Sequence, residues 1–165
     1  MVLGVSENPA VFNFGSLAEY LSDYFHQQTL FIPAQGRFFV DENSGKMSLN
    51  TVVIPVADQS FFDTAMDALT DILAFFPLSV SRIITLHAGS EFPELINRHD
   101  IEAQFVQELS SESLVEAITQ TARSSNADLI VMATGGRTSF VNKITGSSTQ
   151  QVVRRLPCPL LSVSV

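Results

Sequence analysis

Residues Ala133–Ser148 read A-T-G-G-R-T-S-F-V-N-K-I-T-G-S-S, and this stretch decides the fold class. It follows an apolar run, Asp128–Met132 (D-L-I-V-M), and precedes a helical pattern, Thr149–Arg155 (T-Q-Q-V-V-R-R). A buried strand, a glycine-bearing loop and a helix N-terminus in this order cradle phosphate, because the free backbone N–H groups and the helix dipole attract an anion. The order predicts an α/β protein that binds a phosphate-containing ligand.

Strand and helix patterns alternate along the rest of the chain. Runs rich in Val, Ile and Leu are typical of strands buried on both faces of a parallel sheet, and apolar residues at helical spacing lie between them. We therefore expect right-handed β-α-β units in one parallel sheet. The expected strands are Asn50–Val56, Ser81–His87, a weaker candidate Ile101–Val106, Asp128–Met132 and Pro159–Val165, with helices over 61–73 and 114–122 and a loop over 89–100.

The first 33 residues repeat the end of the chain. Gly15-Ser16, a helical stretch and a short apolar run match Gly146-Ser147 and the segments after it, and Leu30 corresponds to Leu161 at the same offset of 131 positions. A shared order of loop, helix and strand indicates an internal repeat. We predict that residues 1–33 are the helix and last strand of a preceding domain copy, 34–49 a linker, and 50–165 the complete domain.

Composition excludes several classes of function. The formal charge is −8 and the nine basic residues are scattered, which argues against a nucleic-acid surface and against an anionic membrane surface. No apolar run is long enough to cross a bilayer, and no signal peptide is evident, so we expect a cytoplasmic protein. The single cysteine, Cys158, excludes an internal disulfide and a cysteine metal cluster, and we expect it to be buried. The motifs of serine hydrolases and zinc proteases are missing, so no catalytic residue and no metal ligand is assigned.

Three motifs make the chain resemble the universal stress protein family. Val53-Ile-Pro-Val56 is similar to the family's V-P-V-D, and Leu86-His87 is similar to its L-H-V. Gly136, nine further residues and then Gly146-Ser147 resemble the family's nucleotide motif, and the ending from Leu156 to Leu161 is also similar. The resemblance covers residues 50–165, with residues 3–33 as a remnant.

The resemblance implies an open five-stranded parallel sheet in the order 3-2-1-4-5, with helices on both faces, plus the N-terminal helix-strand remnant. An adenine nucleotide, ATP or a related molecule with which Mg²⁺ can bind, is then expected at the carboxyl ends of the strands, where the strand order reverses. The nucleoside is expected near Val56, Asp58 and Ala88. The full set of expected binding residues is Pro55, Val56, Asp58, Ala88, Met132, Ala133, Gly136, Arg137, Gly146, Ser147 and Ser148.

Two departures from the family pattern leave two functions open. Ala133 stands where the motif has its first glycine, and Ala57 stands where the family has aspartate, with Asp58 one position later. The first function is a stress-response regulatory module that binds an adenine nucleotide and is at most a slow ATPase, since no base is in place to position a water. The alternative is a nucleotide-independent, dimerising protein-interaction module.

Local expectations follow for the N-terminal strand, for Asp58 and for His87. Family members commonly pair through their last strands, so a homodimer or a pseudo-dimer is expected, with Thr29–Ile32 antiparallel beside Leu160–Val165 in one chain. Asp58 is expected either to bind a ribose or a metal, or to cap the helix that starts near Ser60. His87 is expected to be a core histidine whose ring is satisfied by the backbone.

Overall fold

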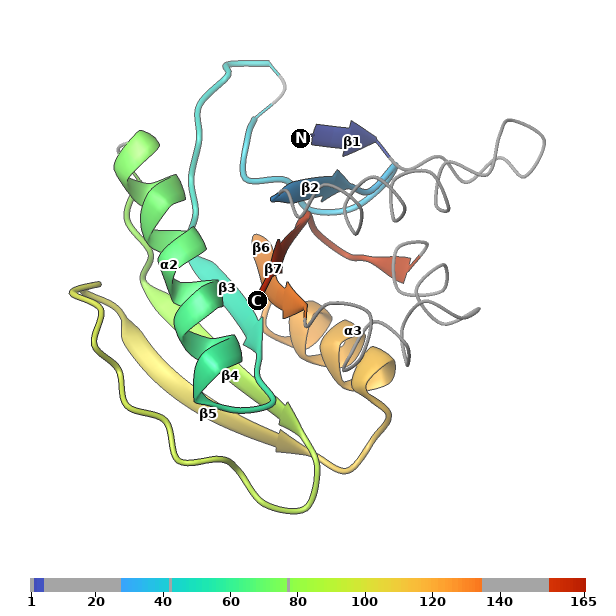
Figure 1. The fold of residues 1–165 in the computed structure, drawn as a ribbon. Helices are drawn as coiled ribbons and strands as arrows, with labels where there is room; N and C mark the ends of the chain where they lie inside the picture. Colours follow the sequence, from blue (N-terminus) through green and yellow to red (C-terminus); the bar gives the residue numbers. More distant parts are fainter. Residues whose placement is uncertain (1, 5–27, 42, 77, 135–154) are drawn as a thin grey trace.

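The computed structural model describes residues 2–4, 28–41, 43–76, 78–134 and 155–165 (Figure 1). None of the helices in these ranges is both long and apolar enough to span a bilayer. The elements are β1 (Val2–Gly4), β2 (Thr29–Ile32), β3 (Thr51–Pro55), α2 (Gln59–Phe75), β4 (Arg82–Ala88), β5 (Gln104–Ser110), α3 (Leu114–Ser124), β6 (Leu129–Thr134) and β7 (Leu160–Ser164).

One sheet carries all the described strands, in the order β1-β2-β7-β6-β3-β4-β5 (Figure 1). Within it, β5-β4-β3-β6-β7 are all parallel and have the predicted order 3-2-1-4-5. The predicted antiparallel pairing of Thr29–Ile32 with the last strand is also confirmed, because β2 runs antiparallel beside β7. The sheet is therefore mixed only where the N-terminal segment joins it.

Two strand predictions need correction. The third strand of the domain is Gln104–Ser110 rather than Ile101–Val106, because Ile101 packs against the core before the strand begins. This strand lies at the edge of the sheet and alternates in exposure, so it lacks the continuous apolar run of the central strands. Strand β1 was not predicted at all, because its three residues are too few for a periodic pattern. The helical stretches expected over 17–25 and 149–155 lie outside the described residues, except for Arg155, which is helical.

The two described helices cover opposite faces of the sheet, as predicted (Figure 1). Helix α2 packs Phe62, Met66 and Leu69 onto one face, which we call the α2 face. Helix α3 packs Ile118 and Ala122 onto the other, the α3 face. The buried side chains lie three or four positions apart, which is the spacing that places residues on one side of a helix.

The predicted linker is fixed to the amino ends of β3 and β6. Asp128, only 2% exposed, pairs with the guanidinium of Arg37 and accepts hydrogen bonds from the backbone N–H groups of Asn50 and Thr51 at 2.8 and 3.0 Å. The N–H of Arg37 donates to the carbonyl of Pro157 at 2.7 Å. One buried carboxylate thus ties the linker to the domain.

Strands β2 and β7 pair so that Leu30 lies opposite Leu161, the residue to which the predicted repeat relates it. Strand β1 runs parallel beside β2, as β6 runs parallel beside β7, and Phe31 packs into the core of the α3 face.

Candidate functional site

The candidate site lies at the carboxyl edge of the sheet. There β3 and β6 stop pairing with each other, and each continues beside its other neighbour. The two strands pair at Val52 with Leu129 and at Val53 with Ile130. Beyond these pairs β3 continues beside β4 as far as Pro55, whereas β6 continues beside β7 as far as Thr134. In an open α/β sheet a ligand binds outside the carboxyl ends of the strands at such a reversal of strand order. The predicted residues Pro55 and Val56 lie at this edge.

His87 lies beside the end of β3. Its Nδ1 is 2.8 Å from the carbonyl oxygen of Val56, so the prediction of a histidine satisfied by the backbone is confirmed. The ring is half-buried rather than enclosed in the core, and its edge faces the ring of Phe92 at a centroid distance of 6.0 Å. Gly89 leaves room for it, because a Cβ there would come within 2.5 Å of Nε2. His87 therefore belongs to the candidate site, although the sequence indicated only a structural role.

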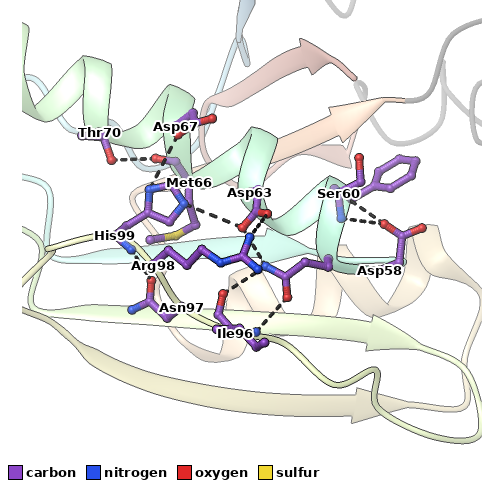
Figure 2. A network of polar contacts seen from close by, with 12 residues as sticks. Asp58, Ser60, Asp63, Met66, Asp67, Thr70, Ile96, Asn97, Arg98 and His99 are labelled. Carbon is purple, nitrogen blue, oxygen red and sulfur yellow. Dashed lines mark hydrogen bonds and ion pairs between the residues drawn. The ribbon is translucent and has the colours of Figure 1, made fainter.

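Asp58 begins helix α2. Its Oδ1 accepts hydrogen bonds from the N–H groups of Ser60 at 2.9 Å and Phe61 at 3.3 Å, which is an N-cap (Figure 2). The predicted capping role is confirmed. The carboxylate is exposed, so its second oxygen can face a ligand while the first caps the helix.

The residues expected from β4 and β6 supply little side-chain polarity. Met132 is buried in the core of the α3 face, and Ala133, only 2% exposed, is buried in that of the α2 face. Ala88 is half-buried at the end of β4. Of these three residues, only Ala88 has side-chain surface that a ligand could contact. The other predicted binding residues, Gly136, Arg137, Gly146, Ser147 and Ser148, lie outside the described residues.

A polar network fixes the loop between β4 and β5 onto helix α2, next to Asp58 (Figure 2). The amide of Gln59 donates to the carbonyl of Ile96 at 3.0 Å and accepts from its N–H at 2.7 Å. Further along the helix, His99 has ring nitrogens 3.9 Å from Asp63 and 3.7 Å from Asp67. No periodic signal in the sequence revealed this network. Among the described residues, no group of His, Cys, Asp and Glu side chains is suited to hold a metal ion.

A sequence model of the universal stress protein family matches residues 82–164, which is just over half of the chain. The chain belongs to this family. A universal stress protein from Thermus aquaticus, encoded in the 3′ region of a QAH/OAS sulfhydrylase gene, is 48% identical over 48 residues. That match covers 29% of this chain and 35% of the relative.

A solved universal stress protein shares the fold. One from Archaeoglobus fulgidus DSM 4304 aligns with 99% of this chain and 59% of its own, at 17% identity and a TM-score of 0.56. Another, solved in complex with cAMP, aligns with 71% of this chain and 98% of its own, at 18% identity and a TM-score of 0.47. This chain therefore spans about three fifths of the A. fulgidus chain and about a third of the T. aquaticus protein.

Proposed function

We propose that this chain is a stress-response regulatory module of the cytoplasm that binds an adenine nucleotide, ATP or a related molecule. The observation that supports the proposal is that β3 and β6 stop pairing with each other at the carboxyl edge of the sheet. The phosphate-loop motif follows β6 directly in the sequence. A ligand at this edge would meet β3 on one side and the motif on the other.

The described residues fit the nucleoside end of such a ligand. Ala57 and Ala88 are half-buried and provide small apolar surface, and the exposed Asp58 can accept hydrogen bonds from ribose hydroxyls through its carboxylate. The phosphates would be bound by backbone N–H groups of Gly136, Gly146, Ser147 and Ser148, with Arg137 offsetting their charge. Mg²⁺ would be held through these phosphates. The bound nucleotide would be hydrolysed slowly at most, because no general base has been identified.

Calorimetric titration with ATP, ADP and AMP tests the proposal, together with two substitutions of Asp58. Asp58→Asn keeps an oxygen that can cap α2 but removes the charge, and should weaken nucleotide binding about tenfold or more, as expected for a lost charged hydrogen bond. Asp58→Ala should weaken binding similarly and also lower thermal stability.

Ser113→Ala is the matched control, since Ser113 caps α3 through the N–H of Glu116 in the way that Asp58 caps α2. It should lower stability and leave nucleotide affinity unchanged. Absence of both binding heat and a thermal shift at millimolar ATP would remove the nucleotide proposal.

A nucleotide-independent interaction module is the second candidate. It is favoured by Ala133, whose methyl group replaces the family's glycine and is buried in the core, and by Ala57 in place of the family's aspartate. The double variant Ala57→Asp, Ala133→Gly restores both family residues. If this variant binds ATP and the unmodified chain does not, the second candidate is the correct one.

We also infer that residues 1–33 are the closing part of a preceding domain copy, 34–49 its linker, and 50–165 the complete domain. Support comes from the strand pairing, in which Leu30 faces its repeat counterpart Leu161. The structure of a longer relative with two complete domains would test this inference: β1 and β2 should superpose on the last two strands of its first domain.

A further inference from the structure

Strand β5 is the edge strand of the sheet, at the end opposite β1 (Figure 1). It has seven residues and pairs, among the described strands, only with β4. Proteins usually protect such an edge with proline, lysine, a bulge or a short strand. Here the sequence Q-F-V-Q-E-L-S contains neither proline nor lysine, its register with β4 is unbroken, and Phe105 and Leu109 are 36% and 49% exposed.

The hydrogen-bonding groups of alternate residues face this open side. The N–H of Gln104 donates to the carbonyl of Ser81, and the carbonyl of Ser110 accepts from Gly89, both at 2.9 Å. Even-numbered residues of β5 therefore direct their backbone groups toward β4. Since the direction alternates along a strand, Phe105, Gln107 and Leu109 direct theirs outward.

These three outward residues are self-complementary. In an antiparallel pair of two copies centred on Gln107, Gln107 lies opposite its own copy and Phe105 lies opposite Leu109. All three then fall in positions where opposite residues exchange N–H···O bonds. An antiparallel pair already exists at the other side of the domain, where Leu30 lies opposite Leu161.

Side chains and charges are compatible with this register. Phe105 pairs with Ile83, whose side chain lies in the core of the α2 face, so Phe105 and Leu109 project on that face. The one charged residue of the strand, Glu108, bonds the hydroxyl of Thr121 at 2.6 Å on the α3 face. The register places Glu108 opposite Val106, so no like charges lie directly opposite each other within the paired strands.

We propose that a second copy of this chain binds along β5, antiparallel and centred on Gln107, to form a two-fold dimer with one continuous sheet. The aromatic–aliphatic pairs of Phe105 with Leu109 add to the backbone bonds. The exposed residues Glu102 and Glu112 flank the strand, and the register brings each toward the other in the partner copy. Their repulsion opposes dimerisation, so added salt strengthens the dimer.

Sedimentation equilibrium of the full chain, over micromolar to millimolar concentrations, tests the dimer. Gln107→Pro removes one outward N–H, and the backbone of an edge strand tolerates proline at such a position. Gln107→Pro and Phe105→Lys should each raise the dimer dissociation constant roughly tenfold or more, given the size of cross-strand pair energies. The control is Phe75→Lys, at an aromatic residue that is 80% exposed near the end of α2, and it should leave dimerisation unchanged.

Crosslinking identifies the register. Gln107→Cys places a thiol next to its own copy at the axis and should give a disulfide dimer under mild oxidation. Gln104→Cys, at another exposed position on the same strand, places the two thiols about 20 Å apart at the usual rise per residue and should not. Cys158 is fully buried and does not compete.

Two results would overturn the proposal. One is a chain that remains monomeric throughout the concentration range at both low and high salt. The other is a dimer that withstands Gln107→Pro and crosslinks equally through positions 104 and 107. Circular dichroism of each variant separates a lost dimer from a lost fold.

Discussion

Asp128 shows how one side chain can hold three segments of the chain together. Its carboxylate is almost fully buried, and it bonds the linker through Arg37 and the start of β3 through two backbone N–H groups. A buried carboxylate is tolerated only when its oxygens are paired, because an unpaired buried charge is costly. The residue therefore matters for stability even though it lies at the amino ends of the strands, away from the candidate nucleotide site.

Removing either partner of this ion pair should destabilise the protein. Arg37→Ala leaves the buried carboxylate with only its backbone donors. Asp128→Ala orphans the N–H groups of Asn50 and Thr51, and we expect it to cost about 1–3 kcal/mol of unfolding free energy for each of these donors. Urea unfolding measures the free energy of unfolding of both variants. Arg98→Ala is the control, since Arg98 is exposed and pairs with Asp63 at 3.4 Å. Such a surface pair contributes about 1 kcal/mol or less. Equal losses in Arg98→Ala and Asp128→Ala would contradict this account.

Because of Cys158, the free energy of unfolding should depend on pH in the alkaline range. Burial, with a further contribution from the charge of Asp128, raises the pKa of its thiol from 9.0 to about 12. Between these values the unfolded chain loses the thiol proton and the folded chain keeps it, so the free energy of unfolding falls as pH rises, by up to about 1.4 kcal/mol per pH unit. Urea unfolding should show a steeper loss above pH 9 for the unmodified chain than for Cys158→Ala. Parallel curves would show that the thiol does not contribute.

At the scale of elements, the loop between β4 and β5 is held by side-chain contacts rather than by regular structure. Gln59 bonds both backbone groups of Ile96, and two acidic residues of α2, Asp63 and Asp67, lie beside Arg98 and His99 (Figure 2). Because Gln59 follows the N-cap Asp58 directly, the position of this loop is coupled to the start of helix α2.

Gln59→Ala should loosen this loop. Without the amide, the N–H of Ile96 loses its partner, and hydrogen–deuterium exchange in residues 93–100 should accelerate by about one order of magnitude, corresponding to roughly 1 kcal/mol per hydrogen bond. The control, Gln120→Ala, changes an exposed glutamine of α3 and should leave exchange in this loop unchanged. Unchanged exchange in Gln59→Ala would show that apolar packing of the loop is sufficient.

The sequence predicted those elements whose physical signal is local. The central strands are buried on both faces, so their continuous apolar runs identified them, and the spacing of apolar residues identified α2 and α3. The predicted bounds of edge strand β5 differ from the observed ones by several residues. Only one face of this strand is well covered, so its sequence lacks a continuous apolar run. The contact of His87 with Val56 and the network around Gln59 join residues more than thirty positions apart, and no local pattern encodes such contacts.

At the scale of the whole molecule, the N-terminal segment is part of the folded sheet. Phe31, 6% exposed, packs among core residues of the α3 face, and β2 pairs with β7 along the edge that the domain would otherwise expose. The segment and the domain therefore share a core, and they should unfold together.

Phe31→Ala should lower the stability of the entire chain. Truncating a buried phenylalanine costs about 3–5 kcal/mol, and the loss should be seen in a single transition by both far-ultraviolet and near-ultraviolet circular dichroism. The control, Phe38→Ala, changes a phenylalanine of the linker that is only partly buried and should cost less. Two separate transitions would show that β2 is attached to the domain without sharing its core.

Strands β2 and β7 belong to one polypeptide, and this covalent connection determines how their pairing responds to dilution. Two separate subunits that join by their last strands come apart when their concentration falls below the dissociation constant. Strands within one polypeptide experience an effective concentration fixed by the connecting segment, of the order of millimolar for short flexible connections. The β7 edge of this protein should therefore stay closed at any level of expression, however scarce the protein becomes.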